Sequence, residues 1–225
     1  MINNDGGNEV INTQRIQEVL DTIPNEQYTT EYVDPADKKG FRNPVREVVG
    51  RGLTELVKRL GIKSGVEFGT ALGRSGLHFA LGGLTRLDTV EFDEEASKQS
   101  QANFDRAGLE GFKVWNTDSG AFGRMWEEPE VGMVFIDHAK ERYLEDFQAI
   151  EPYLAPNALI LLDNTFNRQP ETANAAAYVA DNYYSFIFTE PSTEGETTGL
   201  MVASADRGVI DEAYKALMDV RSEDS

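Results

Sequence analysis

The segment 133–166, MVFIDHAKERYLEDFQAIEPYLAPNALILLDNTF, decides the fold. It begins with the apolar run 133–136 and ends with a second one, 158–162, and short continuous apolar runs are typical of strands buried on both faces. Between the runs, apolar residues recur at helical spacing, which predicts an amphipathic helix. The apolar positions are Tyr143, Phe147, Ile150 and Leu154, with Glu141, Glu145, Asp146 and Glu151 on the other faces. The segment is therefore predicted to form a β-α-β unit.

Each of the two predicted strands stops at an acidic residue. Asp137 follows the first strand, and Asp163 and Asn164 follow the second. A right-handed crossover makes the strands parallel, so their carboxyl ends lie on the same edge of the sheet. Two carboxylates and an amide oxygen are hard ligands that suit Mg²⁺ or another hard divalent cation. One such acidic residue alone would be explained as a helix cap. Two of them on neighbouring strands, with Lys140 one turn after Asp137, favour a functional site instead.

Composition limits the classes of function. The 225 residues are 40% hydrophobic, enough for one substantial α/β core. The net charge of −18, from 39 acidic and 21 basic residues, disfavours nucleic acid and anionic membranes as partners, although the acidity is also compatible with a saline habitat. There is no cysteine, no export signal and no run that could cross a bilayer, so we expect a cytoplasmic protein without disulfides. The oligomeric state stays open.

A glycine-bearing turn lies in VEFGTALGRSGLHFA, residues 66–80, between a predicted strand and a helix. Gly69 and Gly73 allow a tight turn and close approach to a ligand, and the helix start offers free N–H groups to an anion. Ala71 stands where a dinucleotide fingerprint starting at Gly69 needs a glycine, which counts against a nicotinamide-dependent oxidoreductase. The next strand ends at Glu91, 22 residues after Gly69, a spacing that suits a carboxylate bound to a ribose diol, although a capping role is the alternative.

The remaining elements complete an α/β pattern. Helices are predicted at about 10–23, 44–60, 94–107, 170–183 and 209–220, and strands at 87–92, 112–115, 184–189 and 199–204. The polar loop 190–198 fits a hairpin joining the last two strands. The polar turn 116–119 lies where an adenine would be held. Five strands alternating with helices, followed by a hairpin, indicate a doubly wound seven-stranded sheet with one reversed strand.

At this point the chain resembles a known family, the class I S-adenosylmethionine-dependent methyltransferases, and within it the metal-dependent catechol O-methyltransferases. The similarity is carried by FIDHAKERY (135–143) with LLDN (161–164), by VEFGTALGRS (66–75) and by DKKG (37–40), and it extends over about 14–202. It implies a Rossmann-like sheet with one antiparallel strand, helices on both faces and extra N-terminal helices. We expect one methyltransferase domain over 1–225, with a helical cap at about 1–60, a core at about 64–205 and a C-terminal helix at about 207–222.

The resemblance also implies roles for particular residues. It assigns Mg²⁺ to Asp137, Asp163 and Asn164, and the general base to Lys140. It assigns S-adenosylmethionine to Glu67, Gly69, Ser75, Glu91, Ser119, Asp137 and His138, with Ser119 and His138 at the adenine. From the residues themselves, Lys140 could instead be a solvated helix residue and His138 only packed, and His78, within the helix after the glycine turn, is interpreted as structural.

The implied reaction is methyl transfer to a hydroxyl of a small catechol-like or vicinal-diol acceptor. Ala139 replaces a bulky aromatic residue of the family and removes one wall of the catechol slot. Candidates for substrate contact are Tyr32, Arg168 and Glu190, with Glu194 and Glu196 close to Glu190 in sequence. The alternative for Tyr32 is ordinary packing within its loop, and the alternative for Arg168 is a surface charge without a ligand. A caffeoyl-CoA-type or natural-product tailoring O-methyltransferase, and a non-catalytic S-adenosylmethionine-binding protein, remain alternatives.

Overall fold

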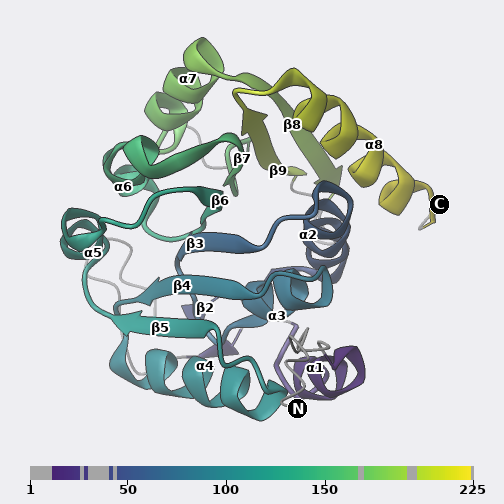
Figure 1. The fold of residues 1–225 in the computed structure, drawn as a ribbon, viewed down its shortest axis with the longest axis vertical. Coiled ribbons are helices and arrows are strands. Elements are labelled where there is room, and N and C mark those ends of the chain that lie inside the picture. Colours follow the sequence, from purple (N-terminus) through teal and green to yellow (C-terminus); the bar gives the residue numbers. More distant parts are fainter. Residues whose placement is uncertain are drawn as a thin grey trace, which may run out of the picture.

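The computed structural model describes residues 12–25, 28–29, 41–42, 45–166, 170–191 and 197–223, and for 28–29, 41–42, 190–191, 197–198 and 223 only the backbone. Its main feature is a seven-stranded sheet in the order β5-β4-β3-β6-β7-β9-β8 (Figure 1). The strands are β3 (Ser64–Phe68), β4 (Arg86–Glu91), β5 (Phe112–Asn116), β6 (Val131–Ile136), β7 (Leu154–Leu162), β8 (Tyr184–Pro191) and β9 (Thr197–Ser204). All neighbours pair in parallel except for β9, which is antiparallel to both β7 and β8. The predicted doubly wound sheet with one reversed strand is confirmed.

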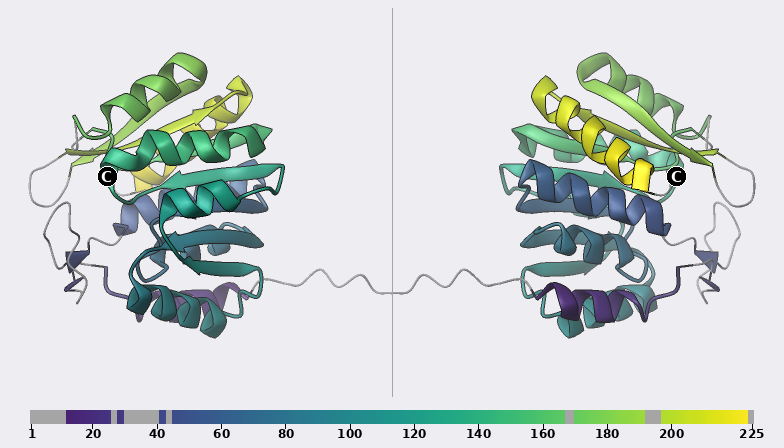
Figure 2. Two further views of the ribbon diagram at one scale, coloured as in Figure 1. Left: turned by 90° about the vertical axis from the view of Figure 1, so that its left-hand side faces the viewer. Right: turned by 90° about the vertical axis from the view of Figure 1, so that its right-hand side faces the viewer.

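Helices cover both faces of this sheet. They are α1 (Thr13–Leu20), α2 (Glu47–Leu60), α3 (Arg74–Leu81), α4 (Glu94–Ala107), α5 (Ser119–Met125), α6 (Tyr143–Ile150), α7 (Ala173–Asn182) and α8 (Arg207–Glu223). Buried residues of α1, α2, α3, α4 and α8 form one apolar core, and those of α5, α6 and α7 form a second one on the opposite face. Figure 2 shows α5, α6 and α7 in one view and α1, α2 and α8 in the other. The sheet is therefore buried on both faces, as its apolar strand runs predict.

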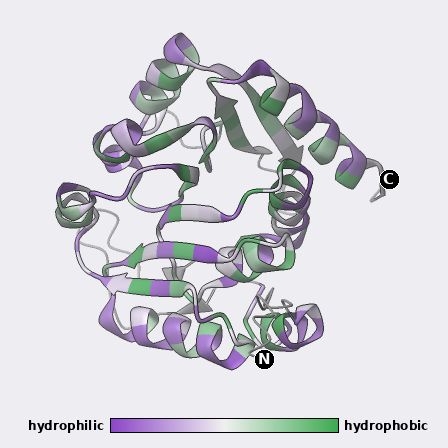
Figure 3. Ribbon diagram, viewed as in Figure 1, coloured by the Kyte–Doolittle hydropathy of each residue, from purple (hydrophilic) through white to green (hydrophobic). Residues whose placement is uncertain are grey.

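The hydropathy pattern explains why these helices pack as they do. The ribbon of α8 carries alternating hydrophobic and hydrophilic bands (Figure 3), and its buried residues Ala213, Ala216 and Leu217 belong to the same core as Leu53 and Leu56 of α2. Because an amphipathic helix is stable only when its apolar stripe is covered, α8 packs on α2 rather than extending into solvent. None of the described helices is both long enough and apolar enough to span a membrane.

Several boundaries differ from the sequence-based expectation. The crossover helix α6 ends at Ile150, and after the 3-10 turn η2 (Glu151–Tyr153) the strand β7 already begins at Leu154, which was expected to be helical. The turn at 116–119 continues directly into the unpredicted helix α5, in which the N-cap Asp118 accepts a hydrogen bond from the backbone of Ala121. A two-stranded hairpin of β1 (Tyr28–Thr29) and β2 (Phe41–Arg42) was also not foreseen.

The topology brings the polar strand ends together. The chain order reverses between β3 and β6, which pair side by side at the centre of the sheet, and ligands of open α/β sheets bind at such a point, beyond the carboxyl ends of the strands. There the backbone of Gly69, after β3, approaches that of Asp137, after β6, so closely that a Cβ on Gly69 would lie 2.2 Å from the Asp137 carbonyl oxygen. With a φ of +102° as well, this position requires glycine.

Candidate active site

The turn after β3 forms one wall of the candidate site. Gly69, Ala71 and Gly73 have φ values of +102°, +48° and +84°, so three left-handed residues bend the chain from β3 into α3. The carboxylate of Glu91, at the end of β4, accepts a hydrogen bond from the backbone N–H of Ala71 at 2.9 Å and another from Asp93 at 2.9 Å. The carboxylate of Glu91 is therefore held against the glycine turn by a direct contact.

Glu67 lies beneath this turn, within β3. It is fully buried, and its two oxygens accept hydrogen bonds from the hydroxyls of Ser75 in α3 and of Thr89 in β4. Burial raises the pKa of Glu67 to about 7, and the carboxylates of Asp137 and Glu91 add to the rise, although the two hydroxyls oppose it. Through these bonds Glu67 orients the hydroxyl of Ser75 beneath the turn.

The ends of β6 and β7 bring Asp137, Lys140 and Asp163 together. Ile136 and Leu162 are partners in the parallel register, so the aspartates that follow them are neighbours. Lys140 begins the 3-10 helix η1 (Lys140–Arg142), and its Nζ lies 2.8 Å from Oδ1 of Asp137 and 2.7 Å from the hydroxyl of Tyr143. Tyr143, fully buried, donates from that hydroxyl to the Asp163 carbonyl oxygen at 3.2 Å. The lysine is thus held at the strand edge instead of extending into solvent.

Two carboxyl groups repel each other at this edge. Burial, followed by repulsion from Asp137, raises the pKa of Asp163 to about 7, and Lys140 only partly offsets it. A divalent cation between the two carboxylates would relieve this repulsion, and their oxygens are the hard donors that Mg²⁺ prefers. Asn164 follows at a φ of +56°, a conformation that asparagine tolerates. Within the described residues no group of three or more His, Cys, Asp or Glu side chains is placed to bind a metal, so the candidate set is two carboxylates with one amide.

The residues assigned to the adenine lie at the ends of β5 and β6. Ser119 is the first residue of α5, and His138 follows Asp137. The His138 ring stacks on Tyr143 with 5.5 Å between centroids and 11° between planes, and its Nε2 lies 2.7 Å from Oδ2 of Asp146. Arg142 donates from Nε to the Ser119 hydroxyl at 3.0 Å and also contacts Asp146. His138 is therefore part of a polar network as well as being packed between rings.

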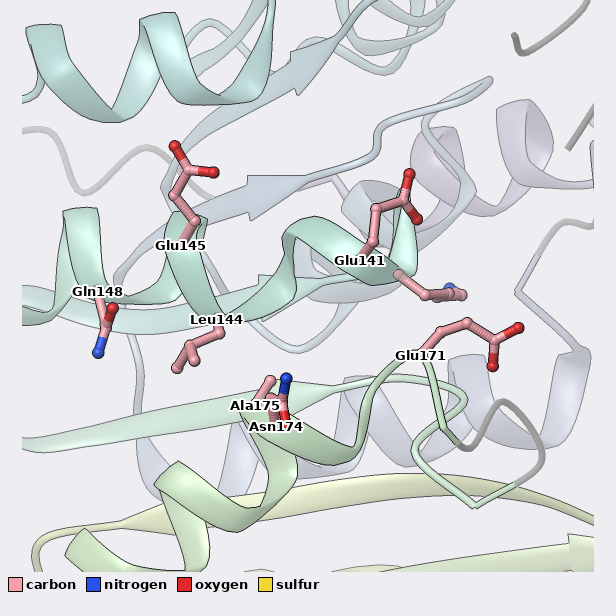
Figure 4. Close-up of a pocket in the computed structure, with 8 residues that line it drawn as sticks. Glu141, Leu144, Glu145, Gln148, Glu171, Asn174 and Ala175 are labelled. Carbon is pink, nitrogen blue, oxygen red and sulfur yellow. The ribbon is translucent and has the colours of Figure 1, made fainter. Parts of the chain in front are cut away.

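A cavity of about 270 Å³ lies between α6 and α7 and reaches this edge at Lys140. In Figure 4, Leu144 points toward Asn174 and Ala175 across the gap, whereas Glu141 and Glu145 point away from α7. The cavity borders the lysine but not the glycine turn, so it is distinct from the space expected for a cofactor.

Other assigned residues fall outside what the structure describes or have structural contacts only. Tyr32, Arg168, Glu194, Glu196 and the segment 37–40 lie outside the described residues, and Glu190 is described in β8 by its backbone alone. His78 is buried between α2 and α3, where Thr54 lies 3.3 Å from its Nδ1, and burial lowers its pKa to about 4. Its contacts agree with the expected structural role.

Sequence reasoning missed two residues of this site, Tyr143 and Asp146. Tyr143 was interpreted only as an apolar position, although its hydroxyl contacts Lys140. Asp146 was expected on a polar face of the helix, which is wrong, because its side chain is fully buried. A signal was available, since position 146 lies three residues after Tyr143 and four before Ile150, on the apolar stripe.

Comparison with known proteins agrees with this geometry. Residues 66–165, from β3 to the turn after β7, match a family model described as a methyltransferase domain. No curated protein matches the chain in sequence. Among solved structures, a putative O-methyltransferase from Klebsiella pneumoniae is 18% identical with a TM-score of 0.66, covering 85% of this chain and 88% of its own.

Two further structures have the same fold. The O-methyltransferase from Bacillus cereus in complex with SAH is 19% identical with a TM-score of 0.63, covering 85% of this chain and 90% of its own. A putative caffeoyl-CoA O-methyltransferase from Staphylococcus aureus is 17% identical with a TM-score of 0.60, covering 72% and 85%. The Rossmann-like architecture expected from the sequence is thus confirmed, and within it residues 66–165 are similar to a methyltransferase domain.

Proposed function

We propose that the protein is an S-adenosylmethionine-dependent O-methyltransferase that needs Mg²⁺ or another hard divalent cation. The observation that carries this proposal is the cluster at the ends of β6 and β7, where Lys140 lies 2.8 Å from Asp137 beside the raised-pKa carboxyl of Asp163. A lysine and two carboxylates at one sheet edge, next to a glycine turn, provide the groups needed to bind and deprotonate a hydroxyl near a methyl donor. The family match over the same residues agrees with it.

The cofactor would lie across the ends of β3, β4 and β6. In this arrangement Gly69 allows the methionine part to approach the backbone, Ser75 contacts it, and Glu91 accepts hydrogen bonds from the ribose hydroxyls. Glu91 already accepts from two backbone N–H groups, which fixes its carboxylate before a ligand arrives. The B. cereus neighbour contains SAH, which supports a ligand of this class for the shared fold.

The chemistry would take place at Lys140. A cation held by Asp137, Asp163 and Asn164 would lower the pKa of an acceptor hydroxyl and hold it in place. Lys140, in its neutral form, would accept the hydroxyl proton at Nζ. S-adenosylmethionine, when bound, would supply the methyl group: the carbon–oxygen bond would form as the methyl–sulfur bond breaks, and SAH would leave. Tyr143 keeps Nζ at this edge through its 2.7 Å contact. General-base catalysis of this kind contributes about 10²- to 10⁴-fold to a rate.

The acceptor is proposed to be a small molecule with a catechol-like or vicinal-diol group. Ala139 follows His138, where the resembling family has a large aromatic residue, and its small side chain leaves room beside Lys140. This difference supports an acceptor bulkier than catechol, such as those of caffeoyl-CoA-type or natural-product tailoring enzymes.

Calorimetry and a methyl-transfer assay test the proposal. The protein should bind S-adenosylmethionine, and with Mg²⁺ it should methylate at least one member of a panel of catechols, caffeoyl esters and vicinal diols. Lys140→Met should lower turnover by at least about 10²-fold with the affinity for SAH unchanged. Lys98→Met, at an exposed lysine that pairs with Glu94 on α4, is the matched control and should retain full activity.

The results would separate this function from its competitors. Binding of the cofactor without transfer to any acceptor would favour a non-catalytic binding protein. Transfer that persists in EDTA would refute the metal requirement while leaving the methyltransferase intact. A Lys140→Met variant as active as the Lys98→Met control would remove Lys140 from the mechanism.

A further inference from the structure

Asp146 is a fully buried carboxylate that the proposed mechanism does not use. Its neighbour on α6, Glu145, is exposed, as most carboxylates on this acidic protein are expected to be. Burying a charge is costly unless it is paired and hydrogen-bonded, so a carboxylate at this place calls for an explanation from its partners.

The partners of Asp146 come from the ends of two different strands. Nε2 of His138, after β6, lies 2.7 Å from Oδ2. Arg142 reaches both oxygens at 3.3 Å and also donates to the hydroxyl of Ser119, which begins α5 after β5. Burial alone would raise the pKa of Asp146, but hydrogen bonds from His138, Ser119 and Arg142 outweigh it and the pKa is lowered. Asp146 is thus ionised and connects the two polar groups assigned to the adenine.

This network also fixes which nitrogen of His138 carries a hydrogen. An ionised carboxylate can only accept, so Nε2 must donate to Asp146. Nδ1 is buried without a hydrogen-bond partner among the described residues, where an N–H would be a costly unsatisfied donor. The ring is held between Phe68 and Tyr143, with centroid distances of 5.7 and 5.5 Å. Both the tautomer and the plane of His138 are therefore determined by α6.

The surroundings are shaped to admit the network. A Cβ on Gly120 would lie 2.3 Å from an Nη atom of Arg142, so a glycine at the start of α5 makes room for the guanidinium. An Nη atom of Arg142 also lies 3.7 Å from Oδ1 of Asp118, the N-cap residue of α5. The arginine therefore connects α6 to the first turn of α5.

We infer that Asp146 is a positioning residue for the nucleoside end of the cofactor site, holding His138 directly, and Ser119 both directly and through Arg142, in the places from which they contact adenine. This inference rests on the proposed function. Asp146 itself would not touch the cofactor, because its side chain is fully enclosed. It would raise affinity by keeping both contacts ordered before the ligand binds, as outer partners of ligand-binding histidines do elsewhere.

The test is the variant Asp146→Asn in the full chain, with SAH as the calorimetric probe. We expect about 10- to 100-fold weaker binding of SAH, with turnover at saturating S-adenosylmethionine within about threefold of the unsubstituted protein. Glu145→Gln removes the same charge at the adjacent exposed position and should bind SAH normally. Unchanged SAH affinity in Asp146→Asn, or a loss confined to turnover, would overturn the inference.

A second readout does not depend on the proposed function. The chain has only two histidines, so their ring nitrogens can be followed by long-range ¹H–¹⁵N NMR and assigned with His138→Gln. His138 should show the Nε2–H tautomer, and Asp146→Leu, which removes the acceptor that an asparagine oxygen would still supply, should abolish this preference while leaving the signals of His78 in place. An unchanged His138 tautomer refutes the positioning role, even in a protein that binds no SAH; absent SAH binding with the expected tautomer change would refute the proposed function alone.

If Asp146→Asn does not fold, Arg142→Gln tests the same connection at a partly exposed side chain. It removes the bond from Arg142 to Ser119 but leaves the bond between His138 and Asp146. We expect about threefold to tenfold weaker SAH binding and an unaltered His138 tautomer. Full SAH affinity in Arg142→Gln would refute the role of Arg142 in holding Ser119.

Discussion

Replacing Glu67 by Gln should change how the stability of the protein depends on pH. Glu67 is fully buried, and burial raises its pKa from 4.5 to about 7. The folded protein therefore holds the carboxyl proton of Glu67 more tightly than the unfolded chain does. The stabilisation is complete below about pH 4.5, declines as the pH rises, and is lost once the pH passes about 7.

The size of the effect follows from the two pKa values. At about 1.4 kcal/mol for each pH unit, the difference between 4.5 and about 7 corresponds to about 3 kcal/mol of unfolding free energy lost across that range. Glutamine has nearly the same shape, and its amide can accept from one hydroxyl and donate to the other, so Ser75 and Thr89 keep partners. The unfolding free energy of Glu67→Gln should therefore rise by about 3 kcal/mol relative to that of the unsubstituted protein as the pH goes from 4.5 to 8.

Urea denaturation from pH 4.5 to 8, at constant salt and without cofactor, measures this difference. Asp163 also titrates near pH 7, but it is present in both proteins and its contribution largely cancels. Glu141→Gln, at an exposed position, is the control and should run parallel to the unsubstituted protein. If the stability difference for Glu67→Gln stays within about 0.5 kcal/mol over the whole range, Glu67 is ionised in the fold and the reasoning is wrong.

Three further outcomes are expected. Gly69→Ala should lower the unfolding free energy measured in urea by about 3 kcal/mol, because its Cβ would lie 2.2 Å from the Asp137 carbonyl oxygen. The control Gly61→Ala, also at positive φ but in open space, should cost only about 1 kcal/mol. Equal losses in the two variants would contradict the close approach at Gly69. Tyr143→Phe should lower turnover about tenfold with SAH affinity unchanged in calorimetry, because only the hydroxyl that holds Lys140 is lost, and unaltered turnover would argue against that role. Raising NaCl from 0.1 to 2 M should raise Tm by about 5 °C, because salt screens repulsion among the charges that sum to −18, and a flat scanning-calorimetry series would refute this.

Much of the fold could be predicted because its signals are local. Apolar runs such as 133–136 and 158–162 mark buried strands, and Gly61 and Gly108 end α2 and α4 in the left-handed conformation that glycine favours. The β1-β2 hairpin and the start of β7 at Leu154 were not predictable in the same way. Each depends on pairing with a partner strand: β2 for β1, and Val131 of β6 for Leu154. Short strands of this kind carry too little local preference to be recognised without the partner.

The strand-end carboxylates were predictable because the β-α-β topology alone makes Asp137 and Asp163 neighbours. The contacts of Glu67 were not, since Ser75 and Thr89 reach it from α3 and β4. The resemblance implies a ligand contact for Glu67, which stays a prediction, and the structure adds that each of its oxygens accepts a hydrogen bond from within the protein. The partners of Glu67 are decided by packing between elements, and for this residue sequence spacing carries no record of them.

The burial of Asp146 could have been predicted by a stricter use of helical spacing. Positions 143, 146, 147 and 150 follow the i, i+3, i+4, i+7 pattern of one helix face, so the aspartate belongs to the stripe that must be buried. A charge in such a stripe is tolerated only with strong partners, and the nearest candidates in sequence are His138 and Arg142, which the structure indeed places against it. A carboxylate within an apolar helical stripe therefore indicates a buried polar network, and in a sheet of this topology that network lies close to the strand ends where ligands bind.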